Sequence, residues 1–158
     1  MSKHKLRVFL DTNVIFSGLY SPEGAPGIIL GHFVKASISV IVSQQVLEEV
    51  VRTVKEKLPE ALPALRKLLV NTPPEVVTDP KLQYIERWAM KLNPGDAAIL
   101  SAALSAQPDY FITGNRHFID NQDIAEEAEL RIVTPAQFLE ARRKEGDIEL
   151  LNGENRSL

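Results

Sequence analysis

The chain contains no cysteine among its 158 residues. This absence excludes disulfides, thiolate nucleophiles and cysteine-based zinc sites. The only histidines are scattered along the chain without the helical spacing of a metal site, at His4, His32 and His117. We therefore expect no zinc site. Any metal bound by this chain should be held by carboxylate oxygens, which suit Mg²⁺ or Mn²⁺.

The sequence also lacks long apolar runs. None is long enough to cross a bilayer. The apolar stretch 6–10 is too short for a signal-peptide core and contains Arg7. We expect a cytoplasmic protein that makes no contact with membranes.

Positive charge and aromatic side chains are scarce. The net charge is −3 and the pI is about 5.7, which argues against a non-specific nucleic-acid coat. A nuclease remains compatible with these values, because the carboxylates that hold its metal make the net charge of the protein more negative. Aromatic residues make up 6% of the chain, so few side chains are offered for stacking on bases. Basic residues cluster locally, and the simpler interpretation is solvated helix faces; they are Arg52, Lys55, Lys57, Arg66, Lys67, Arg142, Arg143 and Lys144.

Short β-rich runs alternate with helical patterns, which is typical of an α/β fold with a mostly parallel sheet. We expect strands at 7–10, 38–42, 75–77, 110–113 and 131–134. We expect helices at 26–34, from Ser43 onwards, around 65–69, at 81–92, at 94–106 and from Pro135. The length favours one domain, here residues 1–144, followed by a flexible polar tail at 145–158.

Three acidic positions can meet at one edge of such a sheet, because sites in parallel sheets lie beyond the carboxyl ends of the strands. Asp11 directly follows the first strand, and Asp96 lies in the first turn of a later helix. The third position is Glu48 or Glu49, which flank the apolar stripe of their helix at similar angles. Periodicity does not choose between them.

Each acid has a structural interpretation when taken alone. Asp11 can cap a helix. Asp96 gains about 0.3–1 kcal/mol from the helix dipole without any further role. Taken together, carboxylates a few ångströms apart repel by about 4 kcal/mol per pair at an effective dielectric near 20. Such a cluster takes up protons or binds a cation.

The order and spacing of these motifs resemble those of PIN-domain nucleases across roughly residues 7–140. The matching segments are Leu10-Asp11-Thr12-Asn13-Val14, residues 43–49, residues 94–100, residues 109–115 and Ile132-Val133-Thr134-Pro135 with Phe138. The stretch 18–27 is also similar to a bacterial and archaeal PIN subgroup of toxin components, related to VapC. The resemblance implies a three-layer α/β/α sandwich with about five strands.

The resemblance also implies roles for individual residues. Asp11, Glu49 and Asp96 match the family's metal-binding acids, with Glu48 as the alternative to Glu49. Residues that match supporting positions around the pocket are Thr12, Asn13, Ser17 and Thr113.

The chain departs from the family at the fourth acid. The corresponding places hold Asn115 and His117. Asn115 can ligate a metal through its carbonyl oxygen but brings no charge. His117 can contact phosphate or pack beside Phe118, and we favour packing. Asp120 and Asp123 can substitute only if the loop folds back. A site with one charge fewer should bind metal more weakly.

The implied activity is Mg²⁺- or Mn²⁺-dependent hydrolysis of single-stranded RNA, leaving a 5′-phosphate and a 3′-hydroxyl. The implied partners are a cognate antitoxin and a second copy of the chain in a homodimer. An aspartyl phosphatase or receiver-type phosphoacceptor is less consistent with the residues, because Asn13 stands where the phosphatases carry a second acid. A PIN scaffold that has lost catalysis and binds RNA or protein is the remaining alternative.

Overall fold

The computed structural model describes residues 5–145 and contains a five-stranded parallel sheet in the order β3-β2-β1-β4-β5. The strands are β1 (Arg7–Leu10), β2 (Ser39–Ser43), β3 (Glu75–Val77), β4 (Tyr110–Ile112) and β5 (Ile132–Val133). The chain order reverses between β1 and β4. In open parallel sheets, ligands bind beyond the carboxyl ends of the strands at this kind of switch point.

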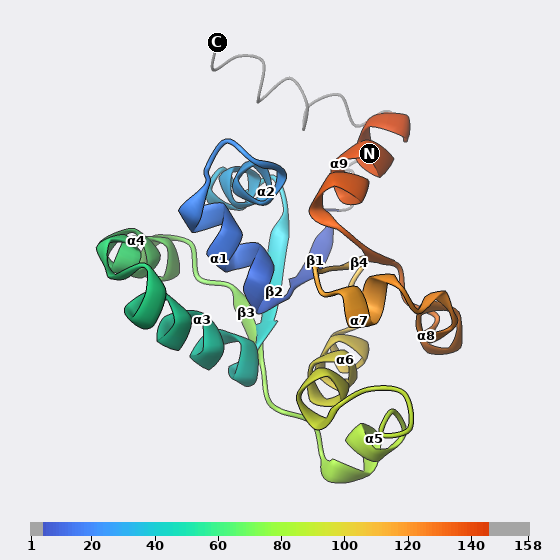
Figure 1. Ribbon diagram of the computed structural model, residues 1–158. Helices are drawn as coiled ribbons and strands as arrows, with labels where there is room; N and C mark the ends of the chain where they lie inside the picture. Colours follow the sequence, from blue (N-terminus) through green and yellow to red (C-terminus); the bar gives the residue numbers. More distant parts are fainter. Residues whose placement is uncertain (1–4, 146–158) are drawn as a thin grey trace.

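Helices cover both faces of the sheet, as Figure 1 shows. On one side lie α1 (Thr12–Tyr20), α2 (Ala25–Val34), α3 (Gln44–Lys57) and α4 (Leu62–Asn71), with a short 3₁₀ turn at Pro59–Ala61. The other side carries α5 (Leu82–Glu86), α6 (Pro94–Ala106) and α8 (Gln122–Ala128), with α7 (Arg116–Ile119) between β4 and α8. The last helix, α9 (Pro135–Lys144), packs against α2 and beside β4 and β5. The expected three-layer α/β/α sandwich is confirmed, and the sheet is parallel throughout.

The two central strands form the core of the molecule. Phe9 and Leu10 of β1 and Phe111 and Ile112 of β4 are fully buried. Strands covered on both faces read as continuous hydrophobic runs, and both of these do. Phe111 makes edge-to-face ring contacts with Phe9 on one side and with Phe118 on the other. This packing fixes the ends of β1 and β4, and hence the residues that follow them.

Most predicted elements match the structure, but the predicted helix at 81–92 is wrong. Only Leu82–Glu86 is helical, and the rest of the segment is a series of turns in which most hydrogen bonds are i→i+3. Leu82, at the start of this segment, is 68% exposed. Trp88 and Leu92 are the buried residues of the segment, and Ile85 packs against the core from a partly buried position, so the segment is anchored without a continuous amphipathic helix.

Three helices were not predicted: α1, α7 and α8. None of the helices within residues 5–145 is both long and apolar enough to span a membrane. The predicted flexible tail begins at Glu145, which caps α9. The remainder of that tail, 146–158, lies outside the described residues.

Candidate functional site

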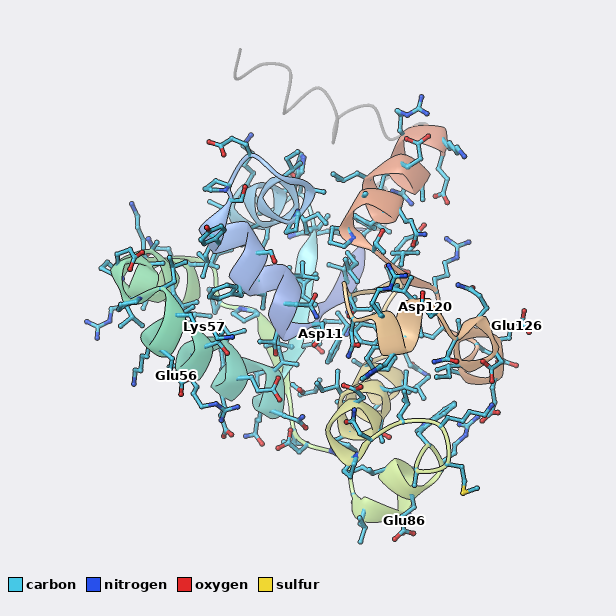
Figure 2. The ribbon with its side chains drawn as sticks, viewed as in Figure 1. Asp11, Glu56, Lys57, Glu86, Asp120 and Glu126 are labelled. Carbon is cyan, nitrogen blue, oxygen red and sulfur yellow. The ribbon has the colours of Figure 1, made fainter. Side chains whose placement is uncertain are left out.

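Asp11 lies at the carboxyl end of β1, at the start of α1 and close to the centre of the view in Figure 2. Its backbone N–H donates to the Ile112 carbonyl over 3.1 Å, which ties it to the neighbouring strand β4. Its Oδ1 accepts a hydrogen bond from the Thr12 backbone N–H over 2.8 Å, so Asp11 is the N-cap of α1. Only 3% of Asp11 is exposed. The helix-capping interpretation of this residue is therefore correct and is compatible with a second role.

Two of the predicted supporting residues, Thr113 and Asn13, bond the other oxygen of Asp11. The hydroxyl of Thr113, fully buried at the end of β4, donates to Asp11 Oδ2 over 2.7 Å. Asn13 Nδ2 donates to the same oxygen over 3.3 Å, and Asn13 Oδ1 accepts from the Gly114 backbone N–H over 2.8 Å. Thr113 in turn accepts from the Asn115 backbone N–H over 3.0 Å. These bonds fix the orientation of the Asp11 carboxylate from both strands.

The environment of Asp11 disfavours its charge. Burial is the main cause and raises the pKa of the Asp11 carboxyl. The hydrogen bonds from Thr113 and Thr12 oppose this shift, while the negative charges of Glu49 and Asp96 add to it. The three predicted acids therefore interact electrostatically across β1, α3 and α6, and a cation would relieve the repulsion between them.

The structure brings Glu49, and not Glu48, to this site. Glu49 Oε2 accepts a hydrogen bond from the Thr12 hydroxyl over 2.8 Å, and its Oε1 accepts from Gln45 Nε2 over 3.2 Å. Gln45 also donates to the Gly95 carbonyl over 3.3 Å, which links α3 to the start of α6. Glu48 is exposed and lines a different surface of α3.

Asp96 is held by three side chains. Asn93 is the N-cap of α6, and its Oδ1 accepts from the Asp96 backbone N–H over 2.8 Å. Asn93 Nδ2 donates to Asp96 Oδ2 over 2.9 Å, and Asn115 Nδ2 donates to Oδ1 over 3.1 Å. His117 Nδ1 lies 2.9 Å from Asp96 Oδ2. The side chain of Asp96 is 13% exposed, so it faces the site from a partly open position.

The predicted packing of His117 beside Phe118 is wrong. The His117 side chain is 66% exposed and its ring contacts Asp96, whereas Phe118 is buried in the core. The reason is the Asn115 N-cap of α7: its Oδ1 accepts from the His117 backbone N–H over 2.9 Å, which starts the helix with His117 directed to Asp96.

The remaining sequence candidates lie outside this network. Asp120 forms an ion pair with Arg116 and Asp123 one with Lys91, and both acids are largely exposed. In the view of Figure 2, Asp120 lies away from Asp11, between α7 and α8. Ser17 is half-buried on α1, and its hydroxyl makes no hydrogen bond to the acids within the described residues. The loop after α7 thus does not fold back to supply a fourth acid.

Two contributors to the site escaped sequence reasoning. Gln45 bridges Glu49 and Gly95, and Asn93 bonds the side chain of Asp96 as well as its backbone. The first had a detectable signal, since Gln45 and Glu49 are four residues apart on one helix face.

The donor set suits a hard divalent cation. A carboxylate offers about four lone-pair sites. Asp11 accepts three hydrogen bonds, Glu49 two and Asp96 three, so each keeps a lone pair for an ion or its water. In the present side-chain conformations, no three acidic or histidine side chains within residues 5–145 are close enough to one another to bind one ion directly. Mg²⁺ commonly uses one or two carboxylates and several waters, which fits this spacing.

A surface groove lies between α3 and α4, apart from the acids. It is lined by apolar residues with basic residues among them, namely Val51, Lys55, Leu62, Leu65, Arg66, Lys67, Leu69 and Val70. The basic cluster predicted on these helices therefore borders an apolar groove that none of the site acids lines.

Comparison with known proteins identifies the fold. A family model described as PIN domain matches residues 7–117. The chain is similar to a chain in the crystal structure of VapBC2 from Rickettsia felis, which is bound to a DNA fragment from the VapBC2 promoter. The TM-score is 0.62 at 17% sequence identity, and the match covers 82% of this chain and 98% of that chain. It is also similar to PAE2754 from Pyrobaculum aerophilum, with a TM-score of 0.56 at 17% identity, covering 85% and 87%. No curated protein matches significantly. Because the PIN match spans more than half of the sequence, the chain belongs to the PIN-domain family, whose members are generally nucleases.

Proposed function

We propose that the protein is an endoribonuclease that hydrolyses single-stranded RNA with Mg²⁺ or Mn²⁺, and that it is the toxin of a type II toxin–antitoxin pair. The observation that carries the proposal is the buried Asp11 carboxylate, which interacts with the negative charges of Glu49 and Asp96 at the switch point of the sheet. Burial of unneutralised carboxylates is costly. A site that concentrates them is suited to a divalent cation.

In this proposal Asp11, Glu49 and Asp96 would hold the metal, which when bound would lower the pKa of a water and polarise the scissile phosphate. The protein residues around them keep the acids in place. Thr12 and Thr113 orient Asp11, and Thr12 also holds Glu49. Such supporting hydrogen bonds typically contribute 10–100-fold to metal affinity or activity.

The partners follow from the family. The similar Rickettsia felis structure is a VapBC assembly. By analogy we propose that a cognate antitoxin binds this chain, that the chain forms a homodimer, and that residues 1–144 act as one nuclease domain in the cytoplasm. Co-purification of the protein with the product of the adjacent gene tests the antitoxin, and light scattering tests the dimer.

A second function is supported by the fourth position of the site. Asn115 occupies it without charge, and its amide already bonds Asp96. A PIN scaffold that binds RNA or protein without cleaving it is therefore the alternative. Titration with Mn²⁺, followed by thermal unfolding, separates the two, because a binding scaffold has no need of the metal.

The deciding experiment is cleavage of a panel of mixed-sequence single-stranded RNAs with Mn²⁺ and with Mg²⁺. Wild type is compared with Asp11→Asn and Asp96→Asn, and with Glu48→Gln as a matched control on the exposed face of α3. Metal-dependent cleavage that is lost in the first two variants and kept in the control supports the nuclease. An inert wild type, or equal cleavage by all variants, favours the binding scaffold.

A further inference from the structure

The α3–α4 groove combines an apolar lining with positive charge. Aliphatic side chains from both helices line it, and one of them, Val70, is 71% exposed. Three cations stand among them, Lys55, Arg66 and Lys67, and no acid of the described residues lines the groove. An exposed apolar surface bordered by charged residues is typical of a contact with another polypeptide.

The three cations have no partner in the part of the chain that the structure describes. Neither an ion pair nor a side-chain hydrogen bond joins Lys55, Arg66 or Lys67 to another residue between 5 and 145. By contrast, Lys91 contacts two carboxylates. The groove therefore offers unneutralised positive charge to an acidic partner, and opposite charges across an interface speed association and fix its register.

The lining of the groove favours a polypeptide over a nucleic acid. Surfaces that hold single strands combine cations with aromatic side chains on which the bases stack. No aromatic residue lines the α3–α4 groove. Its volume of about 880 Å³ lies in the range of pockets that bury most of a bound ligand. Aliphatic side chains with acids beside them would match both its polarity and its charge.

The sequence contains such a segment directly after the described residues. Asp147-Ile148-Glu149-Leu150-Leu151 places three aliphatic side chains next to two acids. We infer that this segment of one copy docks in the α3–α4 groove of a second copy, with its acids facing the three cations, and that the exchange is reciprocal. The inference rests on the homodimer of the proposed function and names the surfaces that join the two copies.

The position of α9 explains why the groove of a second copy is used. The segment continues from α9, which packs against α2 and beside β4 and β5. In the view of Figure 1, α1 and α2 lie between α9 and α4. Leu151 is six residues beyond Glu145, so it reaches at most about 20 Å from it, whereas each helix is about 10–12 Å across with its side chains. A second copy has no such restriction, and exchange in both directions closes a symmetric dimer.

Two charge-reversed variants of the full chain test the exchange. The groove variant carries Arg66→Glu and Lys67→Glu, and the tail variant carries Asp147→Lys and Glu149→Lys. Each variant alone sets like charges against each other at both contacts of its own dimer. A mixture of the two variants restores opposite charges at both contacts. Sedimentation velocity over a range of protein concentrations measures the dimer dissociation constant of each sample.

We expect wild type to dimerise and each variant alone to have a dissociation constant raised by about tenfold or more, because like charges now face each other. The equimolar mixture should recover to within about threefold of wild type. Docking of the segment on its own copy would give no recovery on mixing. The groove variant should keep the melting temperature of wild type, since Arg66 and Lys67 are exposed.

A matched control separates these contacts from a general effect of charge. Lys35→Glu combined with Lys81→Glu changes the net charge as the groove variant does, at exposed residues that do not line the groove. This control should dimerise like wild type and should not rescue the tail variant on mixing. Ile148→Ser combined with Leu151→Ser leaves the charge unchanged and should also raise the dissociation constant by about tenfold or more, because it removes apolar contacts.

A monomeric wild type overturns the inference, as does a dimer that neither pair of reversals weakens. Loss of the adjacent gene's product by the groove variant from a monomeric wild-type background would assign the groove to the antitoxin, which also overturns the inference. RNA cleavage by wild type is followed separately. If cleavage is present and the exchange absent, only the inference fails. If cleavage is absent and the mixture recovers, only the nuclease fails.

Discussion

The Thr12 hydroxyl donates a hydrogen bond to Glu49 Oε2 over 2.8 Å, while the Thr12 backbone N–H donates to Asp11 Oδ1 over 2.8 Å. One residue at the start of α1 thus touches two of the three acids and sets the distance between α3 and the end of β1. This arrangement makes Thr12 a positioning residue for the proposed metal site.

Thr12→Val should lower kcat/KM for RNA cleavage by about fivefold or more, because it removes one net hydrogen bond worth about 1 kcal/mol and frees the Glu49 side chain. Valine keeps the shape of threonine and leaves the backbone bond to Asp11 intact. Thr12→Ser retains the hydroxyl and is the control, which should stay within about threefold of wild type. Wild-type kinetics for the valine variant would show that this bond does not position Glu49.

Asp11→Asn should abolish cleavage and raise the melting temperature measured without metal. Burial is the main cause that raises the pKa of Asp11, so the surroundings of this residue disfavour its ionised form in the native state. The neutral amide removes that charge at almost constant volume. Thermal unfolding of both proteins in EDTA measures the effect, and a lower melting temperature for the variant would contradict it.

The pH dependence of this stabilisation has a definite sign. Because the folded-state pKa of Asp11 lies above its ordinary value of 3.8, the native state binds this proton more tightly than the unfolded state does. Wild-type stability from this group is therefore fully present below pH 3.8 and is lost as the pH rises through the folded-state pKa. The advantage of Asp11→Asn over wild type should be absent in acid and constant well above that pKa.

The parts of the fold that the sequence predicts well have strong local causes. β4 and residues 8–10 of β1 are apolar runs that are buried on both faces, and α6 begins with the consecutive signals of Asn93 and Pro94. Asp11 and Asp96 were found for the same reason, since each sits directly at an element boundary. The spatial meeting of the two then follows from the carboxyl-edge rule for parallel sheets.

The parts that the sequence does not predict depend on tertiary contacts. The choice of Glu49 over Glu48 is made by the hydroxyl of Thr12, on another helix. The orientation of His117 is set by Asp96, which lies 21 residues earlier. The segment 81–92 carries a helical pattern, yet contacts of Trp88, Leu92 and Ile85 with the core anchor it mostly as turns. The spacing of apolar residues within one segment gives no information on such contacts with other segments.

Glu49→Gln should reduce kcat/KM by more than the 10–100-fold typical of residues that only support metal ligands. The amide still accepts from Thr12 but no longer provides a charge for the cation. Glu48→Gln makes the same chemical change one residue earlier on the exposed surface of α3, and should leave kcat/KM within about twofold. Equal losses in the two variants would indicate a general charge effect and not a site at Glu49.

Asn115→Asp should strengthen metal binding and weaken the metal-free fold. Asn115 Nδ2 donates to Asp96 Oδ1 over 3.1 Å, so the substitution replaces an attractive contact with two facing carboxylates. Without metal they repel, and the melting temperature in EDTA should fall, by roughly 2–4 °C for each kcal/mol lost. A divalent cation removes this repulsion and gains a ligand, so the apparent Kd for Mn²⁺ should fall, by roughly tenfold if the added interaction is about 1.4 kcal/mol.

Asn71→Asp provides the matched control for this substitution. It adds the same charge at an exposed residue of α4, in the α3–α4 groove that none of the acids lines. Its Mn²⁺ affinity should equal that of wild type. The metal affinity is followed by the rise in melting temperature with Mn²⁺ concentration, because a ligand that binds only the folded state stabilises it by mass action. If Asn115→Asp binds Mn²⁺ no more tightly than Asn71→Asp, residue 115 does not lie within reach of the ion, and the fourth position is structural in this protein.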